Sequence, residues 1–187
     1  MSRVYLRHAY EVAMANSQDK NTQVGAVLVH DEMGIVASGA NRICNNIELT
    51  DCKLEYPDKK VYMEHAERNA LSNCTIRPDN GTAYVTGQCC NDCMLALWQE
   101  GITKVVMANS HGTKLFDEDA QKRFDLFVSQ TQIEIVRCTP NFSWIHISFI
   151  EGNNFKENSV SSLDPKIHKY YQDTDTYTVG NFTHNIK

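Results

Sequence analysis

The chain has 187 residues and a formal net charge of −5 at pH 7, and this length suits one domain with a hydrophobic core of its own. Its basic residues form no cluster that could neutralise a nucleic-acid backbone, and no apolar run approaches the ~20 residues that span a bilayer, so we expect neither nucleic acid nor a membrane as a partner. The seven cysteines are scattered and odd in number, and the N-terminus lacks a secretory pattern, so a reducing cytoplasm is the expected location.

The first third of the chain predicts a helix, a hairpin and a long loop. Apolar periodicity indicates the helix at residues 3–16, and two β-rich apolar runs at residues 24–30 and 35–41 indicate the hairpin. The turn between these runs ends at Gly34, which can adopt a positive φ. Residues 43–62 are polar and irregular and predict a long loop near the functional site. The helix residues expected to be buried are Val4, Ala9, Val12 and Ala13.

Strands and helices alternate through the next part of the chain. The strands are expected at residues 82–86, 104–108 and 132–136, and the helices at residues 65–73, 91–100 and 117–129. This alternation after a leading hairpin implies an α/β fold, a three-layer α/β/α sandwich with helices on both faces of a mixed central sheet.

The C-terminal part differs in composition. Residues 142–150 alternate in polarity and could add a strand, whereas residues 151–187 are polar with scattered aromatic side chains. We therefore expect a main domain over residues 1–150 and a polar C-terminal extension over residues 151–187. The extension has too little aliphatic content for its own core, so we expect it to wrap the main domain or a neighbouring subunit, with disorder as the alternative.

Two short segments, EHAE at residues 64–67 and CNDC at residues 90–93, are the most informative feature of the chain. Zinc prefers nitrogen and sulfur ligands in a tetrahedron, and a catalytic zinc keeps its fourth position open for water. His65, Cys90 and Cys93 would fill three corners around one catalytic ion per chain. Glu67 is then free to take a proton from the water and deliver it to a substrate. H-x-E followed by P-C-x-x-C is the signature of zinc nucleobase deaminases.

Other interpretations of these segments explain less. A redox-active C-x-x-C gives no role to His65 or Glu67. A closed structural zinc site needs a fourth protein ligand, and the nearest candidate, Cys89, adjoins Cys90, so that chelation of one ion by both is sterically awkward. His65 and Cys90 are both expected at the start of a helix, where the positive potential helps to keep a thiolate deprotonated. The pattern therefore favours a catalytic zinc.

Residues 3–138 resemble the deoxycytidylate (dCMP) deaminase branch of the cytidine deaminase superfamily. The segments that carry the similarity are NTQVGA (21–26), GAN (39–41), EHAERNA (64–70), YVTG (84–87) and WQEGI (98–102).

This resemblance implies a cytidine deaminase-like catalytic domain, zinc as cofactor, a small-molecule deoxynucleotide as substrate, and a homo-oligomer. It also implies that Glu67 shuttles protons, that Asn41 faces the deoxyribose, and that Ala66 offers its backbone amide to the pyrimidine O2. The substrate-binding positions expected in this way are Asn41, Ala66, Val24 and Gly25.

The chain departs from the family pattern at three positions. The proline before the first zinc cysteine is Cys89 here, which leaves open whether the loop over the base is reshaped or Cys89 is simply a small buried residue. The tyrosine of the Gly-Tyr-Asn motif is Ala40, which argues against regulation by a deoxynucleoside triphosphate. Met63 stands where some members place the histidine of a second zinc, which argues against a second ion of that kind.

The leading functional hypothesis is hydrolytic deamination of a deoxycytidine nucleotide, dCMP to dUMP plus ammonia. A triphosphate (dCTP) or a 5-substituted dCMP as substrate would require only local changes in the pocket. A deaminase of another nucleobase or of RNA is a further alternative, and a zinc protein without catalytic activity is the alternative from a different class.

Overall fold

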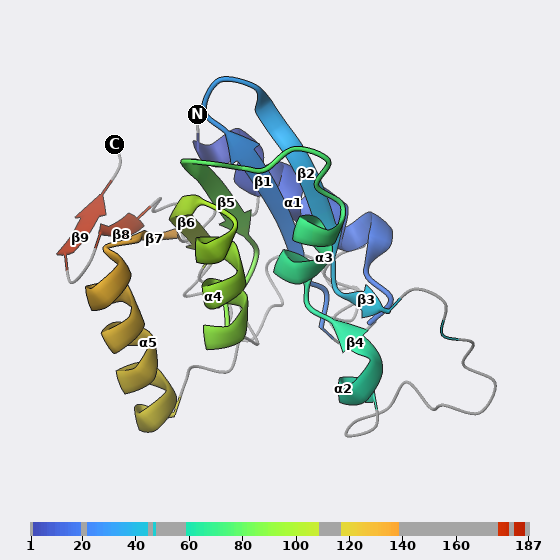
Figure 1. Ribbon diagram of the computed structural model, residues 1–187. Helices are drawn as coiled ribbons and strands as arrows, with labels where there is room; N and C mark the ends of the chain where they lie inside the picture. The colour runs from blue at the N-terminus through green and yellow to red at the C-terminus, as the bar shows by residue number, and fades with distance from the viewer. Residues whose placement is uncertain are drawn as a thin grey trace, which may run out of the picture.

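The computed structural model of the protein describes residues 2–19, 22–44, 47, 59–108, 117–138, 176–179 and 182–185. A central sheet with the strand order β2-β1-β5-β6-β7-β8-β9 dominates it (Figure 1). The strands of this sheet are β1 (Gly25–His30), β2 (Gly34–Ala40), β5 (Gly81–Val85), β6 (Ile102–Ala108), β7 (Glu134–Cys138), β8 (Thr176–Val179) and β9 (Phe182–Asn185). A separate pair consists of β3 (Arg42–Ile43) and β4 (Met63–Glu64), and the helices are α1 (Ser2–Asn16), α2 (Lys59–Tyr62), α3 (Ala66–Ser72), α4 (Asn91–Gln99) and α5 (Glu118–Thr131).

The sheet is mixed, as the sequence predicts. Strand β1 is antiparallel to both β2 and β5, whereas β5, β6 and β7 run parallel to one another. Parallel neighbours require crossover connections, and α4 and α5 provide them between β5, β6 and β7. Beyond β7 the sheet continues with the antiparallel strands β8 and β9.

Helices cover both faces of this sheet. Helix α1 packs against one face in a cluster that includes Tyr10, Val27 and Val106. Helices α3, α4 and α5 cover the other face, where Ala70, Leu97 and Phe124 share one core. Figure 1 shows these three helices in front of the sheet and α1 behind it. The predicted three-layer α/β/α sandwich is therefore confirmed.

The structure corrects one residue in α1. Val4 is 69% exposed, so the prediction that it is buried was wrong. The buried face of the helix is formed by Leu6, Ala9, Tyr10 and Ala13, which follow the i, i+3, i+4, i+7 spacing of one helix face. Val4 lies on the opposite side of the helix.

Three other differences concern short elements. The stretch at residues 43–62 is not simply a loop, because it contains α2 and contributes to the β3–β4 pair, although residues 45–46 and 48–58 lie outside the described part. Strand β7 begins two residues later than predicted, and β8 and β9 were not predicted. The expected strand at residues 142–150 and the expected boundary after residue 150 also lie outside the described residues. In the described ranges, no helix is both long and apolar enough to cross a membrane.

Two glycines allow helices to lie directly on the sheet. A Cβ atom on Gly25 would lie 2.0 Å from the carbonyl oxygen of Ala9 in α1. A Cβ atom on Gly39 would lie 2.3 Å from the backbone nitrogen of Ala70 in α3. Backbone atoms cannot move aside as the end of a side chain can, so the absence of a side chain at these positions sets how closely α1 and α3 approach the hairpin.

We predict that Gly39→Ala destabilises the protein. The added methyl group must push α3 away from β2, and overpacking of this kind costs about 1–3 kcal/mol, which lowers Tm by about 2–4 °C per kcal/mol in a chain of this size. Thermal unfolding measures the effect. Ser38→Ala, on the same strand, is the matched control, and an equal Tm for the two variants would contradict the close approach of α3.

Candidate active site

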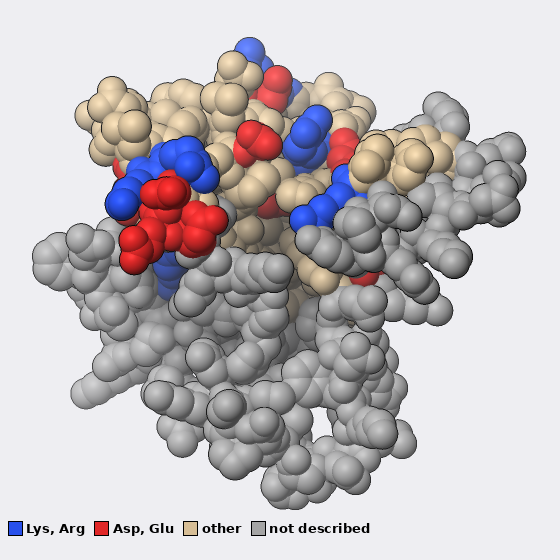
Figure 2. All heavy atoms as spheres, turned by 90° about the horizontal axis from the view of Figure 1, so that it is seen from below, with Lys and Arg blue, Asp and Glu red and all other residues tan. Residues whose placement is uncertain are grey.

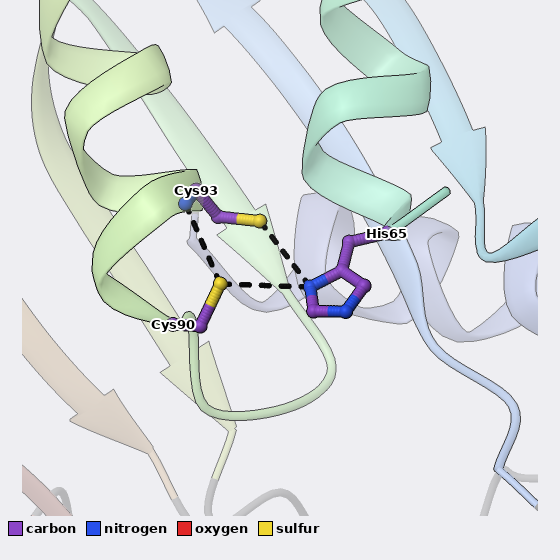
Figure 3. Close-up of side chains that lie close together, drawn as sticks. All are labelled: His65, Cys90 and Cys93. Carbon is purple, nitrogen blue, oxygen red and sulfur yellow. Dashed lines mark hydrogen bonds between the residues drawn. The ribbon is translucent and has the colours of Figure 1, made fainter. Parts of the chain in front are cut away.

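The N-terminal ends of α3 and α4 meet on one face of the sheet (Figure 3). His65 is the N-cap of α3, and Cys90 is the N-cap of α4; both have extended backbone conformations. Cys93 lies in the first turn of α4, so that its side chain faces the same way as that of Cys90. The two helices contact each other along the core-facing side, which brings three side chains from distant parts of the sequence together.

The distances between these side chains match the edges of a metal tetrahedron. The Nδ1 atom of His65 is 3.6 Å from the Sγ atom of Cys90 and 3.5 Å from that of Cys93. Two such ligands of a tetrahedral zinc, with bonds of roughly 2.1 Å to nitrogen and 2.3 Å to sulfur, are about 3.6 Å apart. All three ligand atoms lie within 4.8 Å of one another. The set therefore fits zinc in both its chemistry and its spacing.

The thiols of Cys90 and Cys93 differ in their protonation. A hydrogen bond from the Cys93 side chain lowers the pKa of Cys90 to about 4, against the opposing effect of burial, and a hydrogen bond from His65 lowers it further. The same bond between the thiols raises the pKa of Cys93, which donates it. The hydrogen bond with Cys90 also raises the pKa of His65. The hydrogen bond between the two sulfurs thus favours the thiolate form of Cys90, and a bound metal would replace the proton that they share.

Glu67 lies in the first turn of α3 and is 3% exposed. Burial raises the pKa of its carboxyl group, although a hydrogen bond from its own backbone N–H and the nearby charge of His65 oppose the increase. A buried carboxyl group beside three metal-ligand atoms, and not itself among them, is free to exchange protons with a substrate.

Cys89 is not part of the cluster of potential metal ligands. Its side chain is completely buried in the core below the helices, and burial raises the pKa of its thiol well above the usual value. The thiol also forms a hydrogen bond with Glu67. In the described part of the chain, the only cluster of three or more potential metal ligands consists of His65, Cys90 and Cys93.

The hydrogen bonds of Asn41 hold the segment that follows α1. Its Oδ1 atom accepts from the Ser17 hydroxyl group at 2.7 Å and from the Val24 backbone N–H at 2.8 Å. Its Nδ2 atom donates to the backbone oxygen of Thr22 at 2.6 Å. The side chain is buried, so Asn41 connects the end of β2 to the start of β1 whether or not it also contacts a ligand.

The other expected substrate positions are backbone groups. Gly25 exchanges hydrogen bonds with Thr86 at the end of β5, because its N–H donates to the Thr86 hydroxyl and its carbonyl accepts from the Thr86 N–H, both at 3.0 Å. The N–H and carbonyl of Val24 both bond to Asn41. Ala66 is buried at the first position of α3, where a backbone N–H has no acceptor within the helix.

The sequence reasoning missed the side chains that fix α3. The buried amide of Asn69 accepts from the backbone N–H of Ala40 and donates to the Glu64 carboxylate, both at 3.2 Å. Glu64 also accepts a hydrogen bond from Ser72. These bonds connect Glu64, the residue before His65, to α3, and they connect α3 to the end of β2. The sequence signal was an asparagine at a core-facing helix position, where a polar side chain requires partners.

Comparisons with known proteins agree with this site. Residues 2–109 match the family model of the cytidine and deoxycytidylate deaminase zinc-binding region. A probable deoxycytidylate deaminase of Drosophila melanogaster is 31% identical over 145 residues, which cover 71% of this chain and 70% of the fly protein. The human deoxycytidylate deaminase is 30% identical over 147 residues, covering 74% of this chain and 80% of the human protein.

A solved structure extends the comparison to the fold. The dCMP deaminase of the cyanophage S-TIM5, in complex with dCMP and dUMP, superposes with a TM-score of 0.57 and 25% identity. The match covers 72% of this chain and 93% of the phage chain. The zinc-compatible cluster, the sandwich around it and the matched region of the sequence lead to one conclusion: the chain belongs to the cytidine and deoxycytidylate deaminase family.

Proposed function

We propose that the protein deaminates dCMP by hydrolysis, giving dUMP and ammonia. The observation that carries this proposal is the convergence of His65, Cys90 and Cys93, whose ligand atoms lie within 4.8 Å of one another, beside the buried carboxyl group of Glu67. The relatives named deoxycytidylate deaminases, and the phage enzyme in complex with dCMP and dUMP, support the choice of substrate.

His65, Cys90 and Cys93 are the proposed zinc ligands. Zinc held by three protein groups supplies a Lewis acid with one position open for water. Two thiolates balance the charge of the ion, and the imidazole completes the mixture of nitrogen and sulfur donors that zinc prefers. Both N-caps belong to packed helices, so helix packing positions the three donor atoms within 4.8 Å of one another.

Glu67 is the proposed proton shuttle. Its carboxylate takes a proton from the attacking water and delivers it to N3 of the cytosine ring. The second proton of the water reaches the amino nitrogen on C4, so that ammonia leaves and the carbonyl group of uracil forms. One water molecule supplies the oxygen and both protons, and the reaction requires no other reactant.

The proposed substrate contacts come from the start of β1, the end of β2 and the first residue of α3. The Ala66 backbone N–H would donate to O2 of the pyrimidine, and Asn41 would face the deoxyribose beside Val24 and Gly25. An amide nitrogen carries two hydrogens, and the Thr22 carbonyl takes one of those on Asn41. The second hydrogen is the one proposed to contact the sugar.

The distribution of charge favours a free nucleotide. On the face shown in Figure 2, the described Lys and Arg side chains stand beside Asp and Glu side chains. This mixture differs from the continuous basic surface with which proteins bind nucleic-acid phosphates. The homo-oligomer and the cytoplasmic location expected from the sequence stay predictions, for which sedimentation and cell fractionation are the appropriate measurements.

A substrate screen tests the proposed activity directly. Purified protein with zinc should release ammonia from dCMP with a higher kcat/KM than from dCTP, a 5-substituted dCMP, cytidine or cytosine. Coupled detection of ammonia, with dUMP identified by chromatography, provides the measurement. Preference for dCTP or for the 5-substituted nucleotide would assign a different substrate to the same site, and failure with all five compounds would contradict the proposal.

The ligand assignment predicts one zinc ion per chain. Cys93→Ala removes one of three converging donors, so this variant should lose its metal on dialysis, and its activity with it. Cys74→Ala removes a thiol that does not belong to the cluster and should keep the full metal content. Elemental analysis of the wild type and both variants measures the ratio of metal to chain; a fully metallated Cys93→Ala protein would mean that the ligands are wrongly assigned.

Glu67→Gln should keep zinc but lose about 10²–10⁴-fold in kcat, because glutamine preserves volume and hydrogen bonding but cannot transfer a proton in this way. Steady-state kinetics with dCMP, together with metal analysis, separates this loss from loss of the ion. The exposed Glu118→Gln variant is the control. Activity of Glu67→Gln within tenfold of the wild type would exclude Glu67 as the proton shuttle.

A further inference from the structure

The segment that enters the second metal-binding helix lacks the proline of the family pattern. Residues 86–90 connect β5 to α4, and Cys89 precedes the N-cap Cys90. A proline at this position has a fixed φ and no N–H, which restricts the chain immediately before the first metal thiol. Cys89 has a free φ and an N–H that needs an acceptor when buried. Some other feature must therefore hold this peptide.

Hydrogen bonds hold both backbone polar groups of Cys89. Its buried N–H donates to the Sδ atom of Met107 in β6 at 3.4 Å. Its carbonyl accepts from the side-chain amide of Gln88 at 3.2 Å. The carbonyl oxygen of that same amide accepts a hydrogen bond from the Arg137 guanidinium. Gln88 thus connects the peptide before Cys90 to strand β7.

Arg137 is a well-fixed anchor for this connection. It pairs in register with Met107 across the β6–β7 ladder, so both contacts of the Cys89 peptide lead to the same level of the sheet. Its guanidinium carbon lies 5.7 Å from the ring centroid of Phe124 in α5, a distance at which a cation is attracted to an aromatic face. Phe124 is itself buried.

The orientation of this peptide matters for the metal. The orientation of the Cys89–Cys90 peptide sets the direction in which the chain enters Cys90. The Sγ atom of Cys90 caps α4, because it accepts a hydrogen bond from the backbone N–H of Cys93 at 3.5 Å. A rotation of the Cys89–Cys90 peptide would move this sulfur away from Nδ1 of His65, to which it now lies at 3.6 Å. Groups that orient metal ligands in this way commonly change metal affinity when they are removed.

We propose that Gln88 and Arg137 are positioning residues for the metal site, and that the hydrogen bonds running from Arg137 to the Gln88 side chain, and from that side chain to the Cys89 carbonyl, perform the role of the missing proline. This inference rests on the proposed zinc ligation by Cys90 and Cys93. Neither residue contacts the metal or the substrate in this role. They act through the backbone that presents the first thiolate.

The first test measures zinc affinity by competition with a chelator. Gln88→Ala and Arg137→Met should each weaken zinc binding by about 10-fold or more, within the range typical of groups that orient metal ligands. Arg123→Met removes an exposed cation from α5 and should bind zinc as the wild type does. Arg137 acts on the Cys89 peptide only through Gln88. The double variant should therefore bind zinc no more weakly than the single variant with the lower zinc affinity. Wild-type affinity in Gln88→Ala, or additive losses, would overturn the proposal.

The cobalt-substituted protein provides a readout that general destabilisation does not change. The thiolate-to-cobalt charge-transfer bands report the geometry of the sulfur ligands, so they should shift in Gln88→Ala and Arg137→Met but not in Arg123→Met. Unchanged bands in both positioning variants would contradict a role at the ligands, whatever the Tm values.

Restoring the proline completes the test. In a Cys89→Pro background, Gln88→Ala should weaken zinc binding by less than about threefold, because the ring now restricts the peptide; an equal loss in both backgrounds would overturn the proposal. If Cys89→Pro does not fold, Gln88→Glu is the alternative variant for this test. Its carboxylate still accepts a hydrogen bond from Arg137 but cannot donate one to the Cys89 carbonyl. This variant should lose zinc affinity as Gln88→Ala does, and wild-type affinity would count against the proposal. Wild-type protein that binds no zinc would instead contradict the proposed function.

Discussion

The three donor atoms come from two separate helices, so the site depends on how α3 and α4 pack side by side on one face of the sheet. The three donor atoms lie within 4.8 Å of one another, so two cysteine side chains and an imidazole share a partly buried space, which is unfavourable without a partner ion. The packed core beneath the helices, including the buried Met94 and Leu97 of α4, offsets this penalty. The fold thus stores the geometry that a metal ion requires, and zinc binding should in turn stabilise the fold.

The position of α3 is determined by backbone contact and polar contact together. Gly39 lets the helix backbone lie against β2, and Asn69 connects the same helix to Ala40 and Glu64. Neither contact alone would fix rotation of the helix about its axis, since close packing limits the distance and the hydrogen bonds limit the direction. His65 precedes the first turn of this helix and Glu67 lies within it, so an error of rotation would move a ligand and the proton shuttle at the same time.

Much of the site could be predicted because its signals are local. His65 with Glu67, and Cys90 with Cys93, are spaced within one helical turn, and a residue type with specific chemistry at such a spacing is visible in the sequence. The hairpin was also local, with a positive φ at Gly34 as expected. The contacts that were missed join distant segments: Arg137 with Gln88, Asn69 with Ala40, and the β3–β4 pair. A hydrogen bond between such segments leaves no periodicity in either one, and a two-residue strand is too short to show alternation. The strands β8 and β9 lie in a polar part of the sequence, so its composition did not predict them. They form because β8 pairs with the edge of β7 and β9 pairs with β8.

The hydrogen bonds of Asn41 restrict what the sugar side of the pocket can recognise. Because Val24 N–H and the Ser17 hydroxyl group both donate to its oxygen, the amide orientation is fixed and the lone pairs of Oδ1 are occupied. With one Nδ2 hydrogen on the Thr22 carbonyl, Asn41 can offer a ligand one donor and no free acceptor. In the proposed complex it would therefore bind an oxygen of the deoxyribose that can accept a hydrogen bond, such as a hydroxyl oxygen. A group that can only donate would find no partner there, and its desolvation would be uncompensated. The same bonds that order the segment before β1 thus determine which kind of atom a ligand must present.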